Sequence, residues 1–346
     1  MWLETSVFAQ DLEAFCAAEF IPWERLKGKN VFVTGATGLI GYTLVSGLIY
    51  ANRKRGLDLQ IVALVRSLPR AQEKYAAQLE SGMELTFVEG AVENLPELPG
   101  KIDYVIHGAS QTASRAFVEQ PVETICTAVN GTQNILELAR KKQVSGMVYL
   151  SSMEVYGHPE KGHLVHENEI GAFSPMNIRN CYPIGKIACE SLGNAYAAEY
   201  QLPVITVRLT QTFGPGIAKD DCRVFGEFAR CIIEKRDIVL KSKGETERCY
   251  LYTMDAATAI VQLMLCGNAG EVYTAANRGT YCSISQMAEL VAEMGNVAVR
   301  YELQDIEKLG YASTLYMDLD TSKLEALGWK PTVDLKDMYN RMLQAM

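Results

Sequence analysis

The sequence VFVTGATGLIG, residues 31–41, decides the fold. Its first residues form an apolar run that ends in glycine, which predicts a β-strand buried on both faces of a parallel sheet. Gly35, Gly38 and Gly41 follow at once and open an apolar helical pattern, LIGYTLVSGLIYA. Glycines at these places allow a tight turn, the approach of a pyrophosphate to the backbone, and close packing of the helix on the strand. Because a helix N-terminus also attracts phosphate, the loop predicts a dinucleotide site, with a plain structural turn as the alternative.

Predicted strands and helices alternate from Lys29 onward. Further strands are predicted at 60–65, 84–90, 104–110, 146–152 and 203–209, and helical patterns separate several of them, notably at 121–142 and 183–200. This alternation over residues 29–209 predicts an α/β fold with a doubly wound parallel sheet and helices on both faces.

The two flanking segments are less regular. Residues 210–346 mix turns and short strands with helical patterns at 222–236, 254–266 and 284–295, which predicts a smaller α+β lobe over the sheet's carboxyl edge. Residues 1–28 carry apolar residues at helical spacing and predict a helical extension, to which we assign no chemistry.

The composition narrows the class of partner. Thirty-three basic residues against 41 acidic ones leave a formal net charge of −8, which favours neither nucleic acid nor an anionic membrane surface. No apolar stretch reaches the roughly 18 residues of a membrane helix, and the first residues lack the basic start of a signal peptide. Nine scattered cysteines without a CxxC pair predict reduced thiols, a cytoplasmic location and no metal site.

The end of the second predicted strand bears on the choice of dinucleotide. An acid there would accept hydrogen bonds from the ribose 2′-hydroxyl, but this chain has Arg66 followed by Ser67. A cation favours a 2′-phosphate and hence NADP, whereas stacking of Arg66 on the adenine of NAD is the alternative.

Tyr182 and Lys186, in the sequence YPIGK, are four residues apart and share one face of a predicted helix. Proline is tolerated only in the first turn of a helix, so Pro183 puts Tyr182 at the helix entrance. A tyrosine with a pKa near 10 can act as a base only where a cation stabilises its phenolate, which Lys186 could do. Ser152 and Glu154, in SSMEVYG, end the fifth predicted strand, at the sheet edge where open α/β sheets bind ligands.

Together these motifs resemble the extended short-chain dehydrogenase/reductases, a Rossmann-type family, and in particular the NAD(P)-dependent epimerases and dehydratases of nucleotide-activated sugars. The resemblance covers about residues 29–330. It includes YVIHGAS (104–110), VNGTQNILE with Asn130, RLTQTFGPG (208–216), CRVFGEF, TERCYLYTMD and LGWKP.

The resemblance implies a reaction course. The Tyr182 phenolate takes the proton of the sugar's 4-hydroxyl, the hydride on C4 goes to the nicotinamide, and Ser152 hydrogen-bonds the oxygen. The resulting 4-keto sugar permits epimerisation, dehydration or decarboxylation.

The resemblance also distributes roles among residues. It implies catalytic roles for Ser152, Glu154, Tyr182 and Lys186. It implies that NAD or NADP contacts Gly35, Thr37, Gly38, Leu39, Ile40, Gly41, Arg66, Ser67, Ala109, Tyr182 and Lys186. It implies that the substrate contacts Ser110, Met153, Arg179, Gln211, Arg223 and Arg248, with Arg248 and Arg223 on the nucleotide diphosphate.

Residues near the catalytic set favour one branch. The 4,6-dehydratases carry Asp-Glu where this chain has Met153 and Glu154, and methionine cannot donate the proton that dehydration requires. NIRNCYPIGK (177–186) resembles the segment of the UDP-glucuronate decarboxylases, although Pro183 and Ile184 replace an Asp-Glu pair and Gln211 replaces an asparagine. Decarboxylation or dehydration is therefore favoured, and a 4-epimerase or a non-catalytic cofactor-binding scaffold is the alternative.

Structural roles compete with these assignments. Met153 could fill space by packing, and Glu154 could be an ion-paired structural residue. Arg223 and Arg248 could be solvated surface charges. The resemblance further implies a homodimer formed through a four-helix bundle. Its apolar faces would carry Ile125, Val129, Ile135, Leu138, Ile187, Leu192 and Tyr196.

Overall fold

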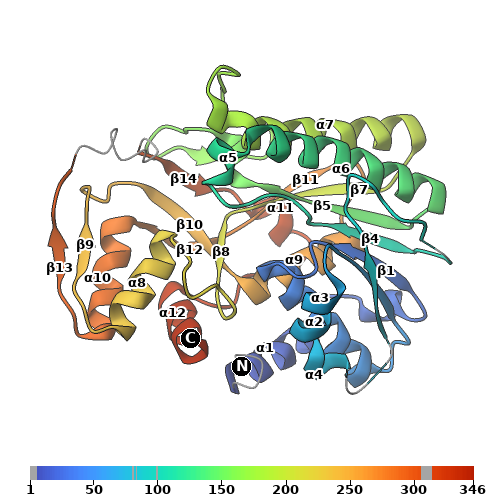
Figure 1. The fold of residues 1–346 in the computed structure, drawn as a ribbon, viewed down its shortest axis with the longest axis horizontal. Coiled ribbons are helices and arrows are strands. Elements are labelled where there is room, and N and C mark those ends of the chain that lie inside the picture. Colours follow the sequence, from blue (N-terminus) through green and yellow to red (C-terminus); the bar gives the residue numbers. More distant parts are fainter. Residues whose placement is uncertain (1–5, 80–81, 83, 99, 305–313) are drawn as a thin grey trace.

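The computed structural model describes residues 6–79, 82, 84–98, 100–304 and 314–346; the first five residues of the predicted extension lie outside this range. A seven-stranded sheet forms its centre (Figure 1). In spatial order the strands are β11 (Val272–Ala275), β7 (Val204–Leu209), β5 (Gly146–Ser152), β4 (Tyr104–His107), β1 (Asn30–Thr34), β2 (Gln60–Val65) and β3 (Leu85–Glu89). All neighbouring pairs are parallel.

The strand order reverses between β1 and β4. From β1 the chain proceeds outward to β2 and β3, and it then crosses to β4 and continues through β5 and β7. In an open parallel sheet such a reversal leaves a crevice at the carboxyl ends of the strands, where ligands bind. The crevice of this sheet therefore lies beside the end of β1, which leads into the glycine loop.

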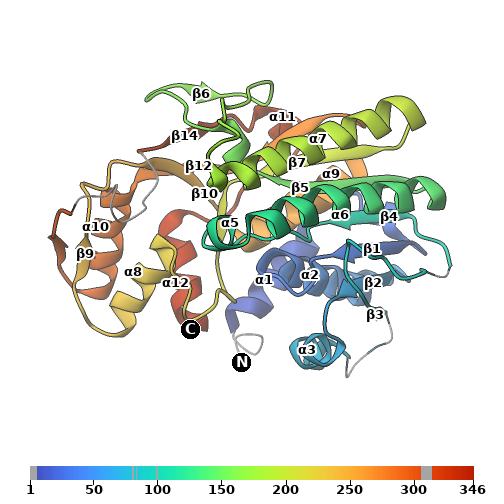
Figure 2. The same ribbon diagram turned by 45° about the horizontal axis from the view of Figure 1, so that its top comes forward.

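Helices cover both faces of the sheet, which confirms the predicted doubly wound fold. On one face, α6 (Pro121–Lys142) and α7 (Cys181–Tyr200) lie side by side (Figure 2). On the other face lie α2 (Leu39–Arg55), α9 (Thr253–Cys266) and α1 (Ser6–Ala17) (Figure 1). Two short helices, α3 (Leu68–Lys74) and α4 (Ala76–Leu79), follow β2. The inner strands β1, β5 and β7 bury nearly all their side chains because both faces are covered.

The smaller lobe is built around a second, mixed sheet. Its strands are β12 (Asn277–Ser283), β10 (Glu247–Tyr252), β14 (Tyr316–Leu319) and β6 (Leu164–Val165), with β8 (Gln211–Phe213) also paired to β10. The helices α8 (Val224–Ile233), α10 (Ile284–Gly295) and α12 (Leu335–Ala345) pack on this lobe, and α11 (Ser322–Glu325) contacts β11. A parallel pair, β9 (Ile238–Leu240) and β13 (Val299–Tyr301), lies at its outer end (Figure 1).

The predicted domain boundary at residue 209 separates two elements, α9 (Thr253–Cys266) and β11, from the large sheet on which they lie. After β8, α8 and β10, the chain returns to the large sheet, where α9 packs behind β5 and β7 and β11 pairs with β7. The pairing gives the backbone of β7 a partner along an edge that would otherwise stay open. Segments before and after residue 209 therefore build the large sheet together.

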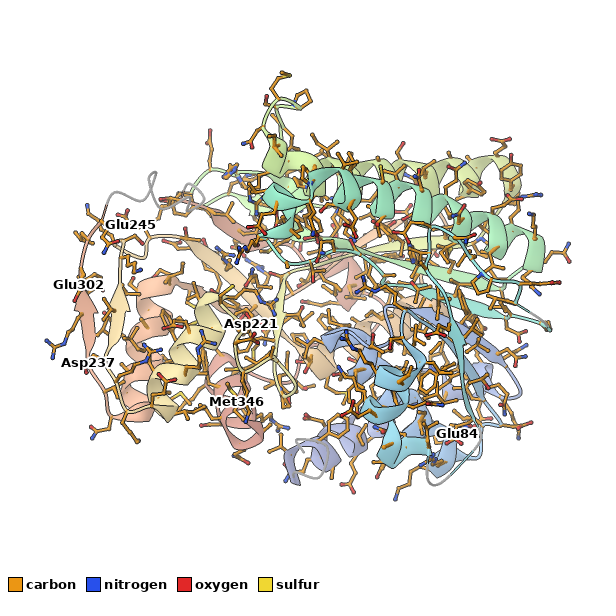
Figure 3. All side chains as sticks on the ribbon, viewed as in Figure 1. Glu84, Asp221, Asp237, Glu245, Glu302 and Met346 are labelled. Carbon is orange, nitrogen blue, oxygen red and sulfur yellow. The ribbon has the colours of Figure 1, made fainter. Side chains whose placement is uncertain are left out.

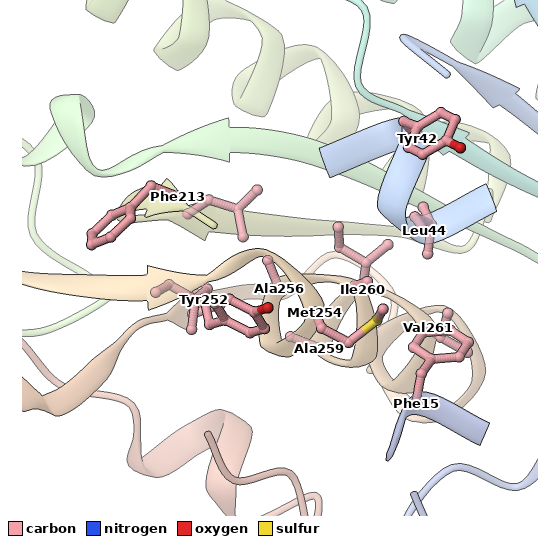
Figure 4. Close-up of a cluster of buried hydrophobic side chains, with 14 of the residues drawn as sticks. Phe15, Tyr42, Leu44, Phe213, Tyr252, Met254, Ala256, Ala259, Ile260 and Val261 are labelled. Carbon is pink, nitrogen blue, oxygen red and sulfur yellow. The ribbon is translucent and has the colours of Figure 1, made fainter. Parts of the chain in front are cut away.

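The predicted helical extension is confirmed as α1 followed by a 3-10 turn, η2 (Trp23–Leu26). Phe15 is fully buried, with its ring 5.3 Å from that of Trp23 and in contact with the Gly47 position of α2. Figure 4 shows Phe15 in one apolar cluster with side chains of α2 and α9. The extension is thus part of the core.

No helix in the described part of the chain has both the length and the apolar character needed to cross a membrane. None of the nine cysteines, all within the described ranges, forms a disulfide.

Candidate active site

The glycine loop joins β1 to α2 with little space around its backbone. Gly35 has φ +74°, and a side chain there would lie 2.7 Å from the carbonyl carbon of Gly108, after β4. A Cβ on Gly41 would lie 2.2 Å from the Gly35 oxygen. The residue before α2 is Gly38, so no capping side chain competes for the amides of the first helical turn. The loop thus leaves the amides at the start of α2 without a side-chain cap, which an anion site at this place requires.

A buried histidine joins the loop strand to its neighbour. His107 Nδ1 lies 2.7 Å from Thr34 Oγ1, and its Nε2 lies 3.1 Å from Thr132 Oγ1. Burial lowers the pKa of His107 to about 3, so this ring is neutral and its role is structural. The Ala109 amide donates to Thr34 Oγ1 at 3.1 Å, which fixes the segment carrying Ala109 and Ser110 beside the glycine loop.

Arg66 is exposed just after β2, as the cofactor prediction requires. Ser67 precedes α3, and the Glu89 carboxylate at the end of β3 accepts the Leu68 amide at 3.0 Å. A basic residue and an acidic residue thus lie at the ends of two neighbouring strands, β2 and β3.

Ser152, Tyr182 and Lys186 come together at the carboxyl end of β5. Lys186 Nζ donates to the Leu150 carbonyl at 2.7 Å and lies 5.8 Å from the centre of the Tyr182 ring. Ser152 is the last residue of β5, and its hydroxyl accepts the Glu154 amide at 3.2 Å. Tyr182 is the second residue of α7 and Pro183 lies in its first turn, which confirms the predicted helix entrance.

Burial disfavours the charged forms of Tyr182 and Lys186. It raises the pKa of Tyr182 well above its usual range; the nearby Glu154 charge raises this pKa further, whereas the Ser152 hydrogen bond and the Arg179 charge lower it. Burial lowers the pKa of Lys186 to about 8. The described residues alone thus keep the phenol protonated at neutral pH, and ionisation needs added positive charge.

Phe117 holds the tyrosine ring, which the motifs did not predict. It belongs to a short helix, α5 (Ala116–Glu119), and stacks on Tyr182 with centroids 4.2 Å apart and planes within 9°. The Cys181 thiol donates to the Phe117 carbonyl at 3.3 Å, and the Arg179 guanidinium lies 5.6 Å from the Phe117 ring. The only signal in the sequence was one aromatic residue among the mostly small or polar residues of 111–120.

Glu154 and Arg179 form an ion pair beside the catalytic set. Arg179 Nη1 donates to Glu154 Oε2 at 2.9 Å, and both side chains are partly exposed. The pair joins two 3-10 turns, η3 (Met153–Tyr156) after β5 and η4 (Ile178–Asn180) before α7. The ion-paired role considered for Glu154 is thus present, and solvent partly reaches both side chains.

Met153 has the packing role that competed with a substrate contact. It is 4% exposed and lies in an apolar cluster with Cys249 and Met317. The Thr210 hydroxyl donates to its sulfur at 3.2 Å. Met153 therefore fills the interior between the sheets and leaves Glu154 without an acidic neighbour at this position.

The two arginines predicted to bind the substrate's diphosphate, Arg248 and Arg223, differ in their surroundings. Arg248 lies on β10, and its Nε is buried without a hydrogen-bond partner among the described residues. Arg223 is exposed and already paired with Asp221 through two atoms, at 3.0 and 2.5 Å; Figure 3 labels Asp221. Gln211 is half-buried on β8 opposite Tyr250. Of the two arginines, Arg248 has the unsatisfied donor that an anion could fill.

A buried ion pair supports the catalytic helix and was not predicted. Arg208 of β7 and Glu190 of α7 are joined at 2.7 Å, with side chains only 3% and 7% exposed. Glu190 also accepts the Ser151 hydroxyl at 2.5 Å, and Arg208 Nη1 donates to the Glu167 carbonyl at 2.8 Å. Charged residues inside an apolar strand and helix were the signal that could have revealed it.

Comparisons with known proteins identify the family and the fold. A sequence model of the NAD dependent epimerase/dehydratase family matches residues 31–277. The UDP-glucuronic acid decarboxylase 1 of Xenopus tropicalis is 26% identical over 96% of this chain and 76% of that protein. The dTDP-D-glucose 4,6-dehydratase of Homo sapiens is 26% identical over 96% of this chain and 94% of that protein. The crystal structure of dTDP-glucose 4,6-dehydratase from Streptomyces venezuelae with NAD bound has a TM-score of 0.76 at 24% identity, over 91% and 96% of the two chains.

Proposed function

Because the chain belongs to the NAD-dependent epimerase/dehydratase family, we propose that it converts a nucleotide-diphosphate sugar through a 4-keto intermediate, with decarboxylation of a nucleotide glucuronate as the preferred reaction. The observation that carries the preference is the interior position of Met153 beside Glu154. The UDP-glucuronic acid decarboxylase similar to this chain supports the same choice.

The glycine loop and Lys186 fit a nicotinamide dinucleotide. A side chain at Gly35 or Gly41 would fill the narrow turn, and the uncapped start of α2 suits the pyrophosphate. When bound, such a cofactor accepts the hydride of the sugar C4 and can return it later. Arg66 favours the 2′-phosphate of NADP, whereas Glu89 adds negative charge close by.

Lys186 and Tyr182 remove the first proton. The Lys186 ammonium, buried and held by the Leu150 carbonyl, favours the phenolate form of Tyr182. The phenolate oxygen accepts the proton of the sugar 4-hydroxyl while the Ser152 hydroxyl hydrogen-bonds the same oxygen. Phe117, stacked on the Tyr182 ring, restricts the rotation of the base.

Glu154 and Arg179 act on the sugar beyond C4. In a 4-keto glucuronate the bond from C5 to the carboxylate breaks, its electron pair moves toward the C4 ketone, and carbon dioxide leaves. This bond-breaking step needs no proton donor, which suits a site whose residue 153 is methionine. The Arg179 guanidinium supplies positive charge for an anionic sugar, and Glu154 transfers the proton that C5 takes up in place of the carboxylate.

Arg248 is proposed to bind the diphosphate of the substrate. Its buried Nε lacks a partner among the described side chains, and an unsatisfied buried donor is costly unless a ligand fills it. Arg223 can bind the diphosphate as well only if it gives up its hydrogen bonds to Asp221.

We further propose a homodimer through α6 and α7. Ile135 is fully buried against the sheet, so it does not belong to the outer face that the sequence suggested. Four large apolar side chains are exposed around the starts of these helices: Val118, Val122, Met176 and Ile178. Light scattering should give a dimer for the native chain and a monomer for Val122→Glu. Val239→Glu on β9 serves as the control; a native monomer overturns the proposal.

Parallel incubations with a nucleotide glucuronate and a nucleotide glucose test the reaction. We expect loss of carbon dioxide from the glucuronate, detected by mass spectrometry, and a rate lower by about 10² to 10⁴ with Tyr182→Phe. A 6-deoxy-4-keto product from the glucose compound alone would overturn decarboxylation in favour of dehydration. Unchanged mass with inverted C4 would indicate an epimerase. Binding of NAD without turnover of either sugar would indicate a scaffold.

A further inference from the structure

Two consecutive residues at the end of α3 hold two consecutive carbonyls of the glycine loop. Lys74 Nζ donates to the Thr37 carbonyl at 2.7 Å, and the Tyr75 hydroxyl donates to the Ala36 carbonyl at 2.6 Å. Both residues lie outside the segments that carry the family resemblance, and neither has a role in the reaction proposed above.

The side chains that make these contacts are themselves held firmly. Tyr75 is fully buried, with its ring 4.8 Å from that of Tyr42 and 5.5 Å from that of Phe87. The Lys74 ammonium lies 4.9 Å from the centre of the Tyr42 ring, and burial lowers the pKa of Lys74. Tyr42 belongs to α2 and follows Gly41 directly, so one aromatic cluster anchors both the loop and the residues that hold it.

This arrangement matters because the loop is poor in side chains. Gly35 and Gly38 flank Ala36 and Thr37, and glycine backbone has more conformational freedom to lose than any other. Thr37 and Gly38 are exposed, whereas Ala36 is buried. Without the contacts of Lys74 and Tyr75, the loop would become ordered only when the dinucleotide binds. The entropy lost in that ordering would weaken the affinity for the dinucleotide.

We propose that Lys74 and Tyr75 are positioning residues for the dinucleotide, which fix the glycine loop in its binding form before the ligand arrives. The inference rests on the proposed function, since it requires that the loop binds NAD or NADP. It assigns part of the cofactor affinity to residues that do not belong to the glycine motif.

Calorimetric titration of the full chain with NAD, after removal of any dinucleotide that co-purifies, tests the inference. We expect Lys74→Met and Tyr75→Phe each to raise the Kd for NAD by about 3- to 10-fold, the usual range for one lost hydrogen bond. Lys74→Arg keeps a donor and should restore most of the affinity. Saturating NAD should return kcat of both weakened variants to the native value, because the catalytic residues are untouched.

Lys54→Met is the matched control. Lys54 also lies over a tyrosine ring of α2, that of Tyr50 at 5.4 Å, and removing it should leave the Kd unchanged. A Kd within twofold of the native value for both Lys74→Met and Tyr75→Phe would overturn the inference. If Lys74→Met unfolds, Tyr75→Phe decides, since it keeps the ring and loses only the hydroxyl. Failure of the native chain to bind either dinucleotide would instead refute the proposed function.

Discussion

Arg179 and Glu154 are joined by a 2.9 Å hydrogen bond, and they have opposite effects on the same catalytic group. The Glu154 charge raises the pKa of Tyr182, and the Arg179 charge lowers it. Burial is the main cause of the raised pKa of Tyr182, and the ion pair adjusts it further, in addition to whatever each side chain does to the sugar.

Opposite shifts are expected when either partner is neutralised. Glu154→Gln should lower the pKa of Tyr182 and move the rising limb of C4 oxidation to lower pH, because Arg179 is then unopposed. Arg179→Gln should move the same limb to higher pH. Pre-steady-state reduction of NAD, followed at several pH values, measures both. Glu154→Gln should still reduce NAD transiently, but complete turnover should be blocked. If the rising limb moved in the same direction in both variants, this account would be contradicted.

The alkaline limb of activity should report Lys186. Its pKa is lowered by burial to about 8, so the ammonium loses its proton, and with it the charge that supports the phenolate, as pH rises above that value. We expect kcat to fall above about pH 8 in the native enzyme. Lys186→Arg keeps its charge to much higher pH, so its slower reaction should lack this limb. An identical limb in the two enzymes would assign it to another group.

Arg66 should act selectively on the phosphorylated dinucleotide. Arg66→Ala removes an exposed cation at the end of β2 and should weaken NADP binding several-fold, with a smaller effect on NAD. The ratio of the two Kd values, measured by calorimetry for native and variant proteins, isolates the effect. A native preference for NAD that survives the substitution would show that Arg66 does not read the 2′ position.

The buried pair of Arg208 and Glu190 should dominate the stability of the catalytic helix. Removing one partner leaves an uncompensated buried charge, so Arg208→Met should cost about 3–5 kcal/mol of unfolding free energy. The double variant with Glu190→Met should cost less than the sum of the single changes, because no lone charge remains. Denaturant unfolding measures each, and a cost below about 1 kcal/mol for Arg208→Met would contradict the prediction.

Asp11 should make stability depend on pH between about 4 and 6. Burial raises its pKa to about 6, although the Tyr252 hydroxyl and Arg341 hydrogen-bond it; the charge of Asp255 adds to the rise. The folded chain thus holds this proton more tightly than the unfolded chain, whose pKa is about 3.9. Stability should therefore fall as pH rises through this window.

The contribution of Asp11 can be isolated by substitution. Asp11→Asn should flatten the change in stability across the window, whereas the exposed Asp220→Asn should leave it as in the native chain. Thermal unfolding at several pH values provides the measurement, and an unchanged pH dependence in Asp11→Asn would assign the effect elsewhere.

Local sequence was sufficient for the elements that position the site. The apolar runs at 60–65 and 146–152 match β2 and β5, and the helical pattern at 121–142 matches α6, because each strongly prefers one periodicity. Tyr182 and Lys186 could be assigned because the helix fixes their spacing. Ser152 and the glycine loop could be assigned because they follow strands.

Long-range partners could not be predicted in the same way. The four residues of β11 contain no signal for the sheet they join, and their pairing with β7 depends on the path of the intervening chain. Phe117 reaches Tyr182 from the short helix α5, 65 positions earlier in the sequence. Arg223 stays a prediction, because the structure shows only that Asp221, two residues away, pairs with it.

The return of the chain to pair β11 with β7 has a consequence for biosynthesis. While the protein is being made, β7 leaves the ribosome long before residues 272–275, so the nascent large sheet ends in an unpaired apolar edge. Such edges recruit strands from other chains. Premature termination between residues 210 and 271 should therefore yield insoluble fragments, and efficient production depends on completing translation through β11 before neighbouring nascent chains meet.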